Sequence, residues 1–206
     1  MLKYLILILF LFLMFNDELK LYLIKNGYFR ETLYNLSCKR DHQIHNLIKE
    51  HLLGDNLNIL NFGCGLNTYT KLLEEKGHIV FPLDVIDQSI YGTVNLYDGK
   101  TLPKETKFDY VIISTVLHHI PLKQQFLILN QLKEISKNII IIEDYVNKNI
   151  FSFIKTAFIC AFANLSFLDR EYSFRNHDEW MKLFECLNPK NIKYISTEFE
   201  IYLLEF

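Results

Sequence analysis

Short apolar runs alternate with helix-like stretches along the middle of this 206-residue chain, and this alternation limits the fold more than any other feature. The stretches between the runs, at 67–76 and 121–136, are predicted helices. Strands joined by helices at this spacing lie parallel, with right-handed crossovers, in a doubly wound α/β sheet. The runs predicted to be strands cover residues 57–62, 79–83, 93–96, 108–114 and 138–142.

The C-terminal end follows a different pattern. Two further strands are predicted at 192–197 and 201–206, with very little chain between them. Only an antiparallel hairpin connects two strands so tightly. The prediction is therefore a mostly parallel seven-stranded sheet that ends in an antiparallel hairpin. Ahead of the sheet, Asp41 is expected to begin a helix that runs to about Leu53, after an irregular stretch at 35–38.

Composition and charge exclude some classes of protein. Half of the residues are apolar and 15% are aromatic, which is typical of a globular chain. The net charge is -2, so no broad basic face for nucleic acid is expected. The four cysteines show no C-x-x-C or zinc-type spacing, which favours free thiols in the cytoplasm. His42 and His45 lie three residues apart on a predicted helix and are interpreted as surface residues.

The N-terminus carries an uncharged apolar run from Tyr4 to Phe15. Twelve residues of helix reach about 18 Å, which is short of the roughly 30 Å hydrocarbon core of a bilayer. We expect residues 1–40 to form an apolar segment and a lead-in helix, with residues 2–15 lying in a membrane surface. A short transmembrane anchor and a helix packed on the domain are the alternatives. Residues 41–206 are predicted to form one domain.

The stretch ILNFGCGLN, at 59–67, joins the first predicted strand to the helix that follows. In an open parallel sheet, ligands bind beyond the carboxyl ends of the strands. Gly63 and Gly65 let the backbone approach a ligand closely. Asp84 ends the next strand about twenty residues further on, where an acid bonds ribose hydroxyls. A dinucleotide fingerprint needs glycine at the position of Thr68, which disfavours a nicotinamide-dependent reductase.

Together with four later segments, this turn resembles the motifs of the class I S-adenosylmethionine-dependent methyltransferases. LNFGCGLN is similar to their first motif, L-D-x-G-C-G-x-G. The later segments follow in the same order, and the terminal hairpin is also a mark of that fold. The resemblance covers about residues 41–206 and implies a Rossmann-like methyltransferase fold with S-adenosyl-L-methionine as cofactor. The later segments are VFPLDVID, YDGKTLP, FDYVIISTVLHHI and IIIIEDY.

The resemblance also implies a set of cofactor-binding residues. In that family, the acid matched by Asp84 binds the ribose and the one matched by Asp98 contacts the adenine amino group. The full set implied here is Asn61, Gly63, Cys64, Gly65, Asp84, Val85, Asp98, Gly99 and Ser114.

Two positions depart from the family's pattern. Asn61 stands where the family has an acid that helps to hold the methionine ammonium, and Asn67 stands where it has glycine. Asparagine tolerates the left-handed backbone conformation better than most residues, so the turn can survive at Asn67. Asn61 can accept a hydrogen bond but carries no charge, so weaker donor binding is expected.

Candidate catalytic residues follow the fourth and fifth predicted strands: His118 and His119 after the fourth, Glu143 and Asp144 after the fifth. A general base is needed only if the methyl acceptor carries a proton, and histidine has a suitable pKa for that task. The alternative is that the histidine pair only shapes the site. The four side chains could also hold a divalent ion, but buried hydrogen bonding explains the same residues, and no metal is predicted.

An insert at about 148–175 has no charged residue from Thr156 to Leu168. It is interpreted as a core helix or as an apolar lid over a hydrophobic acceptor. The N-P-P-[YF] signature of amino-group methyltransferases is missing after the fourth strand, which disfavours DNA amines. The sequence therefore predicts a methyltransferase acting on a small-molecule or lipid-like acceptor at a membrane surface. The alternative, motivated by Asn61 and Asn67, is a catalytically weakened binding or scaffold protein with the same fold.

Overall fold

A computed structural model of the protein describes residues 22, 27–102, 106–144 and 173–206. Within these ranges one seven-stranded sheet has the order β3-β2-β1-β4-β5-β7-β6. The first five strands run parallel, and β7 is antiparallel to both of its neighbours. The predicted doubly wound sheet and its terminal hairpin are therefore confirmed. The strands are β1 (Asn58–Phe62), β2 (Ile79–Asp84), β3 (Asn95–Leu96), β4 (Tyr110–Ser114), β5 (Asn138–Asp144), β6 (Asn191–Ser196) and β7 (Phe199–Glu205).

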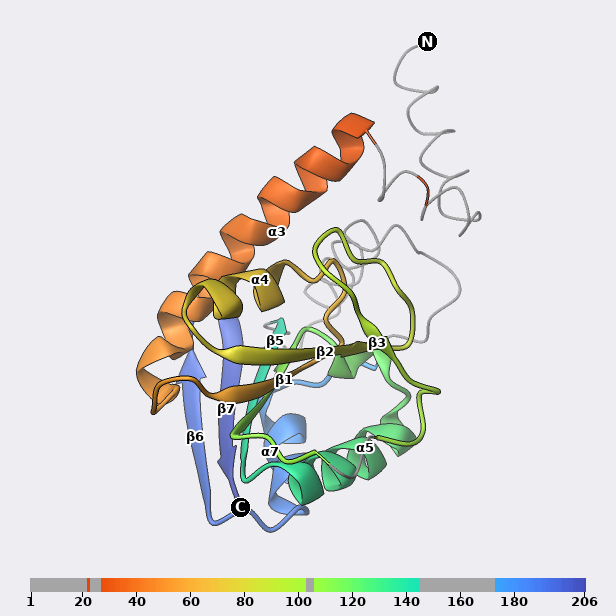
Figure 1. The fold of residues 1–206 in the computed structure, drawn as a ribbon. Coiled ribbons are helices and arrows are strands. Elements are labelled where there is room, and N and C mark those ends of the chain that lie inside the picture. The colour runs from red at the N-terminus through yellow and green to blue at the C-terminus, as the bar shows by residue number, and fades with distance from the viewer. Residues whose placement is uncertain (1–21, 23–26, 103–105, 145–172) are drawn as a thin grey trace.

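Helices cover both faces of this sheet (Figure 1). One face carries α3 (Gly27–Ile48) and α4 (Thr68–Glu75), and the other carries α5 (Leu122–Ile135) and α7 (His177–Glu185). Successive strand residues point to opposite faces, so Ile59 belongs to the core under α3 and α4, whereas Leu60 belongs to the core under α5 and α7. Two short 3-10 turns complete the elements, η1 (Lys49–His51) and η2 (Leu117–His119).

Helix α3 differs from its prediction. It runs without a break from Gly27 to Ile48, so the irregular stretch expected at 35–38 and the helix start expected at Asp41 are wrong. Residues 35–38 contain no glycine or proline, so keeping them helical costs little. Ile44 and Ile48 are fully buried against the sheet and hold the C-terminal half of the helix in place. The predicted boundary at residue 40 falls inside this helix.

The two histidines of α3 lie in different environments. His42 is exposed, as interpreted from the sequence, but His45 is only 8% exposed and contacts the ring of Tyr69 edge-on. Burial lowers the pKa of His45, and nearby positive groups lower it further. The surface interpretation of His45 is therefore wrong, because the helix turns that residue toward α4.

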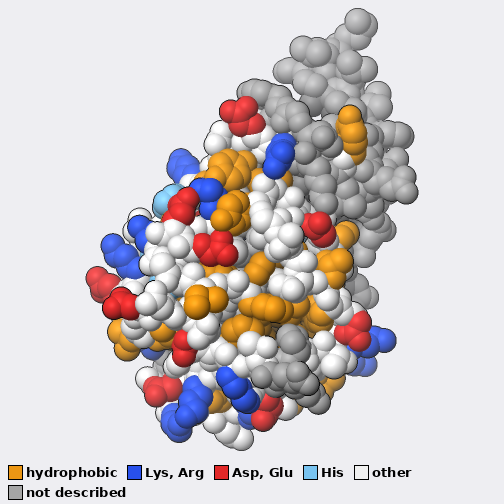
Figure 2. All heavy atoms as spheres, in the orientation of Figure 1, with side chains coloured by type: hydrophobic (Ala, Val, Ile, Leu, Met, Phe, Trp, Pro, Cys, Tyr) orange, Lys and Arg blue, Asp and Glu red, His pale blue; other side chains and the backbone are white. Residues whose placement is uncertain are grey.

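Residues 1–21 and 145–172 lie outside the described part of the chain. They contain the apolar N-terminal run and most of the predicted insert, so both remain predictions. Among the described residues, no helix is long and apolar enough to cross a membrane. On the face of the molecule in Figure 2, acidic and basic side chains are interspersed around apolar ones.

Candidate active site

A cavity of about 640 Å³ opens at the carboxyl ends of the parallel strands. Its walls come from the turn after β1, the ends of β2 and β5, the segment after β4, and part of α3. This is the edge at which open α/β sheets bind ligands, and the volume suits a small molecule. Nearly all of the residues predicted to bind a cofactor contribute to it: Asn61, Gly63, Cys64, Gly65, Asp84, Val85, Gly99 and Ser114.

The two glycines of the turn have different structural roles. Both have positive φ, at 70° for Gly63 and 52° for Gly65. A Cβ added to Gly63 would lie 2.4 Å from a methyl group of Val116, so this glycine is required for packing between the turns after β1 and β4. A Cβ added to Gly65 would meet no atom within 4 Å. Gly65 is therefore the position where bare backbone faces open space.

Asp84 fixes this turn to the end of β2. Its Oδ2 accepts a hydrogen bond from the Gly65 N–H at 2.8 Å, and its Oδ1 accepts from the N–H groups of Val85 and Ile86 at 2.7 and 3.3 Å. A carboxylate has about four acceptor positions, so three N–H donors leave capacity for one further donor. Asp84 thus orders the turn and can still accept a hydrogen bond from a ligand hydroxyl.

Asn67 adopts the left-handed conformation that the sequence predicted for it, with φ of 64° at the N-terminus of α4. Its Nδ2 donates to the carbonyl of Tyr91 at 2.7 Å. The side chain that replaces the family's glycine therefore ties the loop after β2 to the glycine turn. The neighbouring Thr68 is buried, and its hydroxyl donates to Asp41 of α3 at 2.5 Å. Burial raises the pKa of that Asp41 carboxyl, against the opposing effect of the hydrogen bond.

Asn61 is the last but one residue of β1, lines the cavity and is 2% exposed. Its Nδ2 donates to the hydroxyl of Thr70 at 2.9 Å. Because the amide nitrogen is used in this contact, the amide oxygen is the end that can accept from a ligand. Asn61 supplies no negative charge at this place.

Asp98 is the predicted cofactor residue that does not line the cavity. It is exposed, and its Oδ1 accepts from the backbone N–H groups of Thr101 and Lys100 at 2.7 and 2.8 Å. These bonds lower the pKa of Asp98. Its neighbours Tyr97 and Gly99 do line the cavity, so a contact from Asp98 to adenine stays a prediction that this geometry does not support.

His118 and Glu143 form a buried pair. Each side chain is 1% exposed, and His118 Nδ1 lies 2.5 Å from Glu143 Oε2. The other carboxylate oxygen accepts from the N–H groups of Leu117 and Val116 at 2.9 and 3.2 Å. The His118 ring stacks on Phe174 with centroids 4.8 Å apart. His118 lines the cavity but Glu143 does not, so Glu143 fixes the orientation of His118 from behind.

The other two candidates lie beside this pair. His119 and Asp144 both line the cavity, and the ring of His119 is 4.1 Å from that of His118, centroid to centroid. Among the residues described here, no group of three or more His, Cys, Asp or Glu side chains is arranged to hold a metal ion.

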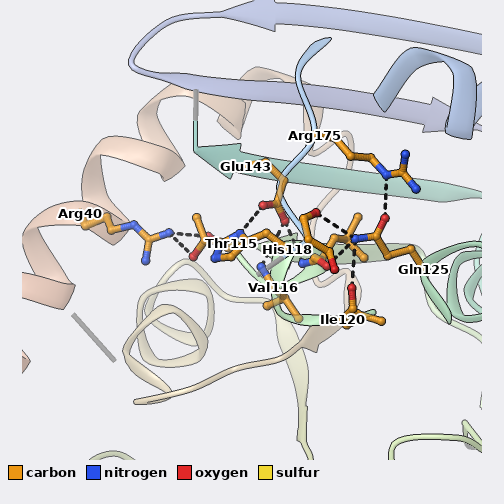
Figure 3. A network of polar contacts seen from close by, with 11 residues as sticks. Arg40, Thr115, Val116, His118, Ile120, Gln125, Glu143 and Arg175 are labelled. Carbon is orange, nitrogen blue, oxygen red and sulfur yellow. Dashed lines mark hydrogen bonds and ion pairs between the residues drawn. The ribbon is translucent and has the colours of Figure 1, made fainter. Parts of the chain in front are cut away.

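Sequence reasoning missed two residues of this site, Arg40 and Thr115. Arg40 reaches from α3 to the end of β4, where its Nη2 donates to Thr115 Oγ1 at 2.6 Å and lies 3.4 Å from Ser114 Oγ (Figure 3). Thr115 has φ of 54°, which is rare for a β-branched residue. No sequence signal marks either one, because Arg40 and Thr115 are far apart in the chain and a left-handed threonine has no local signature.

Gln125 of α5 holds the segment Leu117–Ile120, which follows Thr115 in the chain (Figure 3). Its Nε2 donates to the carbonyls of Leu117 and Ile120 at 2.9 and 3.1 Å, and its Oε1 accepts from Arg175 Nε at 2.8 Å. The backbone N–H of Ser173 also donates to the His118 carbonyl at 2.7 Å. Through its bond to Gln125, Arg175 supports the segment Leu117–Ile120, and it does not line the cavity.

Comparison with solved structures places this architecture among methyltransferases, whereas no family model and no curated protein matches the sequence. The magnesium protoporphyrin IX methyltransferase of Synechocystis PCC 6803, with bound SAH, has a TM-score of 0.60 at 15% identity, over 90% of this chain and 92% of that one. A SAM-dependent methyltransferase from Archaeoglobus fulgidus has a TM-score of 0.57 at 18% identity, over 75% of this chain and 71% of that one. Human N-acetylserotonin methyltransferase in complex with SAM has a TM-score of 0.54 at 13% identity, over 72% of this chain and 47% of that one. The chain thus has the fold of the class I S-adenosylmethionine-dependent methyltransferases.

Proposed function

We propose that this protein is an S-adenosylmethionine-dependent methyltransferase that acts on a small-molecule or lipid-like acceptor. The observation that carries the proposal is the placement of Gly65 and Asp84 on one cavity wall, joined by a 2.8 Å hydrogen bond. Open backbone at Gly65 leaves room for a nucleoside, and Asp84 keeps the capacity to accept a bond from a ribose hydroxyl. Structural neighbours with bound SAH or SAM support the same choice of cofactor.

The residues of the chain mainly align the reactants and accept a proton. When bound, the cofactor supplies a methyl group that is already activated on a sulfonium. Alignment in a cavity that excludes water is then the main contribution of the protein. With the hydrogen of neutral His118 on Nδ1, facing Glu143 at 2.5 Å, its Nε2 carries the lone pair of a base. His118 can thus take the proton that an acceptor hydroxyl or amine loses on methylation.

The lining of the cavity supports an acceptor with apolar parts. Its wall includes the apolar residues Val116, Ile120, Ile128 and Phe199. The same lining also holds many polar and charged side chains, so the cavity suits an acceptor that has both apolar and polar parts. We propose that the apolar residues 2–15 bring the enzyme to a membrane surface, where a lipid-like acceptor would be concentrated.

The membrane part of the proposal is tested by flotation of the full chain with liposomes. Replacing two apolar residues of the segment, Ile8→Asp and Phe12→Asp together, should remove flotation because each buried charge opposes insertion. The same pair of changes should leave cofactor binding as it is. Equal flotation of both proteins would contradict the membrane proposal.

The enzymatic proposal is tested with donor carrying a labelled methyl group, offered with lipid and metabolite extracts. Label in an extracted molecule, dependent on His118, is the expected result. The neutral Asn61 favours a second candidate, a protein that binds through this fold without transferring methyl groups. Binding of S-adenosylhomocysteine without label transfer to any extract would favour that second candidate. No binding of either adenosyl compound at millimolar concentration would reject the proposed cofactor.

A further inference from the structure

Two glutamates lie side by side behind His118. Glu143 of β5 and Glu200 of β7 are direct partners in the antiparallel pairing of these strands. Their side chains therefore leave the same face of the sheet, with Cβ atoms about 5 Å apart. Glu143 is 1% exposed and Glu200 is fully buried. Two carboxyl groups that share a buried place do not both ionise readily, so we expect this pair to keep one proton.

The contacts of the two carboxyl groups indicate which of them holds that proton. Glu143 accepts from two backbone N–H groups after β4, and its other oxygen lies 2.5 Å from His118 Nδ1 (Figure 3). Such contacts favour the ionised form. Glu200 Oε2 accepts from the Tyr202 hydroxyl at 3.0 Å, but Oε1 is buried and has no hydrogen-bond partner among the described residues. A buried oxygen without a partner disfavours the charge, so the proton belongs on Glu200.

The charges around Glu200 make this proton exchangeable near neutral pH. Burial is the main cause that raises the pKa of Glu200 to about 7. The hydrogen bond from Tyr202 opposes this rise, and the negative charges of Glu143 and of Asp178 on α7 add to it. A proton with such a pKa is gained or lost at little cost near pH 7.

Tyr202 connects the pair to the N-terminus of α7. Its hydroxyl lies 3.0 Å from Glu200 Oε2 and 3.1 Å from Nδ1 of His177. His177 is half-buried and is the first residue of α7. Its ring stacks on the ring of Tyr202, with an interplanar angle of 11°. The glutamate pair thus has the cavity histidine on one side and, through Tyr202, a half-buried histidine on the other.

We propose that Glu200 is a positioning residue of the transfer reaction: the Glu143–Glu200 pair holds one proton and releases it when His118 takes the proton of the acceptor. This role rests on the proposed use of His118 as the base. The release keeps the net charge of the buried group constant. A neutral ring beside a pair with one proton becomes an imidazolium beside two carboxylates, which stabilise it.

The protons and electrons balance in this scheme. The acceptor's bond to hydrogen breaks, and its proton bonds to His118 Nε2. The electron pair left on the acceptor forms the bond to the methyl group, and the electrons of the S–C bond stay on sulfur. The O–H bond of Glu200 breaks, its proton goes to the Tyr202 oxygen, and the hydrogen of that tyrosine goes to His177 Nδ1. After the product leaves, Nε2 gives its proton to water and the pair takes one up through His177.

The first test looks for the shared proton in the free protein by infrared spectroscopy. Glutamate side chains carry ¹³C at the carboxyl carbon, which separates their bands from those of aspartates such as Asp41. At about pH 6 the wild type should show one protonated glutamate that is lost by about pH 8. Glu200→Gln should lack it, and Glu198→Gln, which removes an exposed carboxylate from the same hairpin, should keep it. No such band in the wild type, or an equal band in Glu200→Gln, overturns the inference.

The second test asks whether the pair and His118 exchange protons as coupled groups. The ring signal of His118, assigned with His118→Gln, is followed by NMR against pH in the free protein. Coupled groups titrate together, so the wild-type curve should be broader than that of a single proton. Glu200→Gln should give a single-proton curve, and Glu198→Gln the wild-type curve. A purely structural Glu200 would leave the shape unchanged, so equal shapes in the wild type and Glu200→Gln overturn the coupling.

The inference and the proposed function fail separately. In methyl transfer, the ratio of the wild-type rate to that of Glu200→Gln should rise by up to about tenfold between about pH 6 and about pH 8, as Glu200 ionises. Methyl transfer with a constant ratio rejects the role of Glu200 and leaves the enzyme standing. A coupled titration without methyl transfer to any extract supports the proton pair and rejects the enzyme.

Discussion

The two halves of the cavity are built in different ways. The glycine-loop half, Gly63–Asn67 with Asp84, is held through its own backbone N–H groups: the Leu83 carbonyl accepts from two of them, and the Asp84 carboxylate accepts from a third. The histidine half, Thr115–His119 with Glu143, is held by side chains from distant elements. The first half can be recognised in a short motif because its contacts are local or lie between neighbouring strands. The second half depends on contacts that no short motif records.

This difference suggests that the glycine-loop half serves the cofactor and the histidine half serves the acceptor. A loop that is fixed by its own backbone can hold the same cofactor in many proteins. A turn that is fixed by Arg40, Glu143 and Gln125 depends on three elements, so it can vary with the acceptor. The predictions below separate the two halves or show where they are joined.

The largest expected effect is on the rate of methyl transfer, and it separates the function of the histidine half from that of the glycine-loop half. His118→Gln should lower the rate of methyl transfer by about a hundredfold to ten-thousandfold, as loss of a general base does, and leave the affinity for S-adenosylhomocysteine near that of the wild type. Glu143→Gln should have a smaller effect on the rate, because it disturbs the orientation of the base rather than removing it. Single-turnover transfer of labelled methyl to the acceptor found in the extract screen measures both. A drop in cofactor affinity equal to the drop in rate would mean that His118 belongs to the cofactor site.

Gly63→Ala tests where the halves are joined. Its new Cβ would lie 2.4 Å from Val116 of the histidine half, at a φ of 70°. Overpacking and left-handed strain together should lower the free energy of unfolding by about 3 kcal/mol. Gly65→Ala has the strain but no clash, so it should cost about 1 kcal/mol. Urea unfolding of both variants gives the comparison, and equal losses would show that the contact with Val116 adjusts easily.

Glu200, which lies next to the histidine half, should make the free energy of unfolding depend on pH. It is fully buried and lies directly opposite Glu143 in the pairing of β5 with β7. Burial raises the pKa of Glu200 to about 7, helped by Glu143 and opposed by the hydrogen bond from Tyr202. Between about pH 4.5 and pH 7 the folded state then holds a proton that the unfolded state has lost. The free energy of unfolding should therefore fall as pH rises through this range, by up to about 3 kcal/mol.

Urea unfolding at pH 5 and pH 8 measures this slope. Glu200→Gln should flatten it, because the substituted side chain does not titrate. Glu198→Gln removes an exposed carboxylate from the same hairpin and should keep the wild-type slope. If the wild type and Glu200→Gln lose the same stability between the two pH values, Glu200 does not carry the effect.

The sheet could be predicted from the sequence because apolar runs as strong as NIIII admit few other structures. The glycine turn was predictable for a similar reason: Gly63, Gly65 and Asp84 are close in sequence or end neighbouring strands. The contribution of α3 to the site could not be predicted in this way. The sequence around Asp41 looks like a helix start, but α3 runs through it, with Ile44 and Ile48 packed in the core. Arg40 and Thr115 meet through that packing, so no local pattern could have indicated their contact.

Asn61→Asp should produce the smallest effect and return the glycine-loop half to the family's pattern. The introduced carboxylate would lie in a wall position that is 2% exposed, so it should lower the stability of the free protein. With bound S-adenosylhomocysteine it gains an ammonium as partner, and affinity for that compound should rise about tenfold relative to the analogue without the amine. Asn67→Asp adds the same charge to the same turn at a residue that does not line the cavity, so it should give no such gain. If Asn61→Asp leaves the ratio of the two affinities unchanged, the ammonium of the bound compound does not lie next to residue 61.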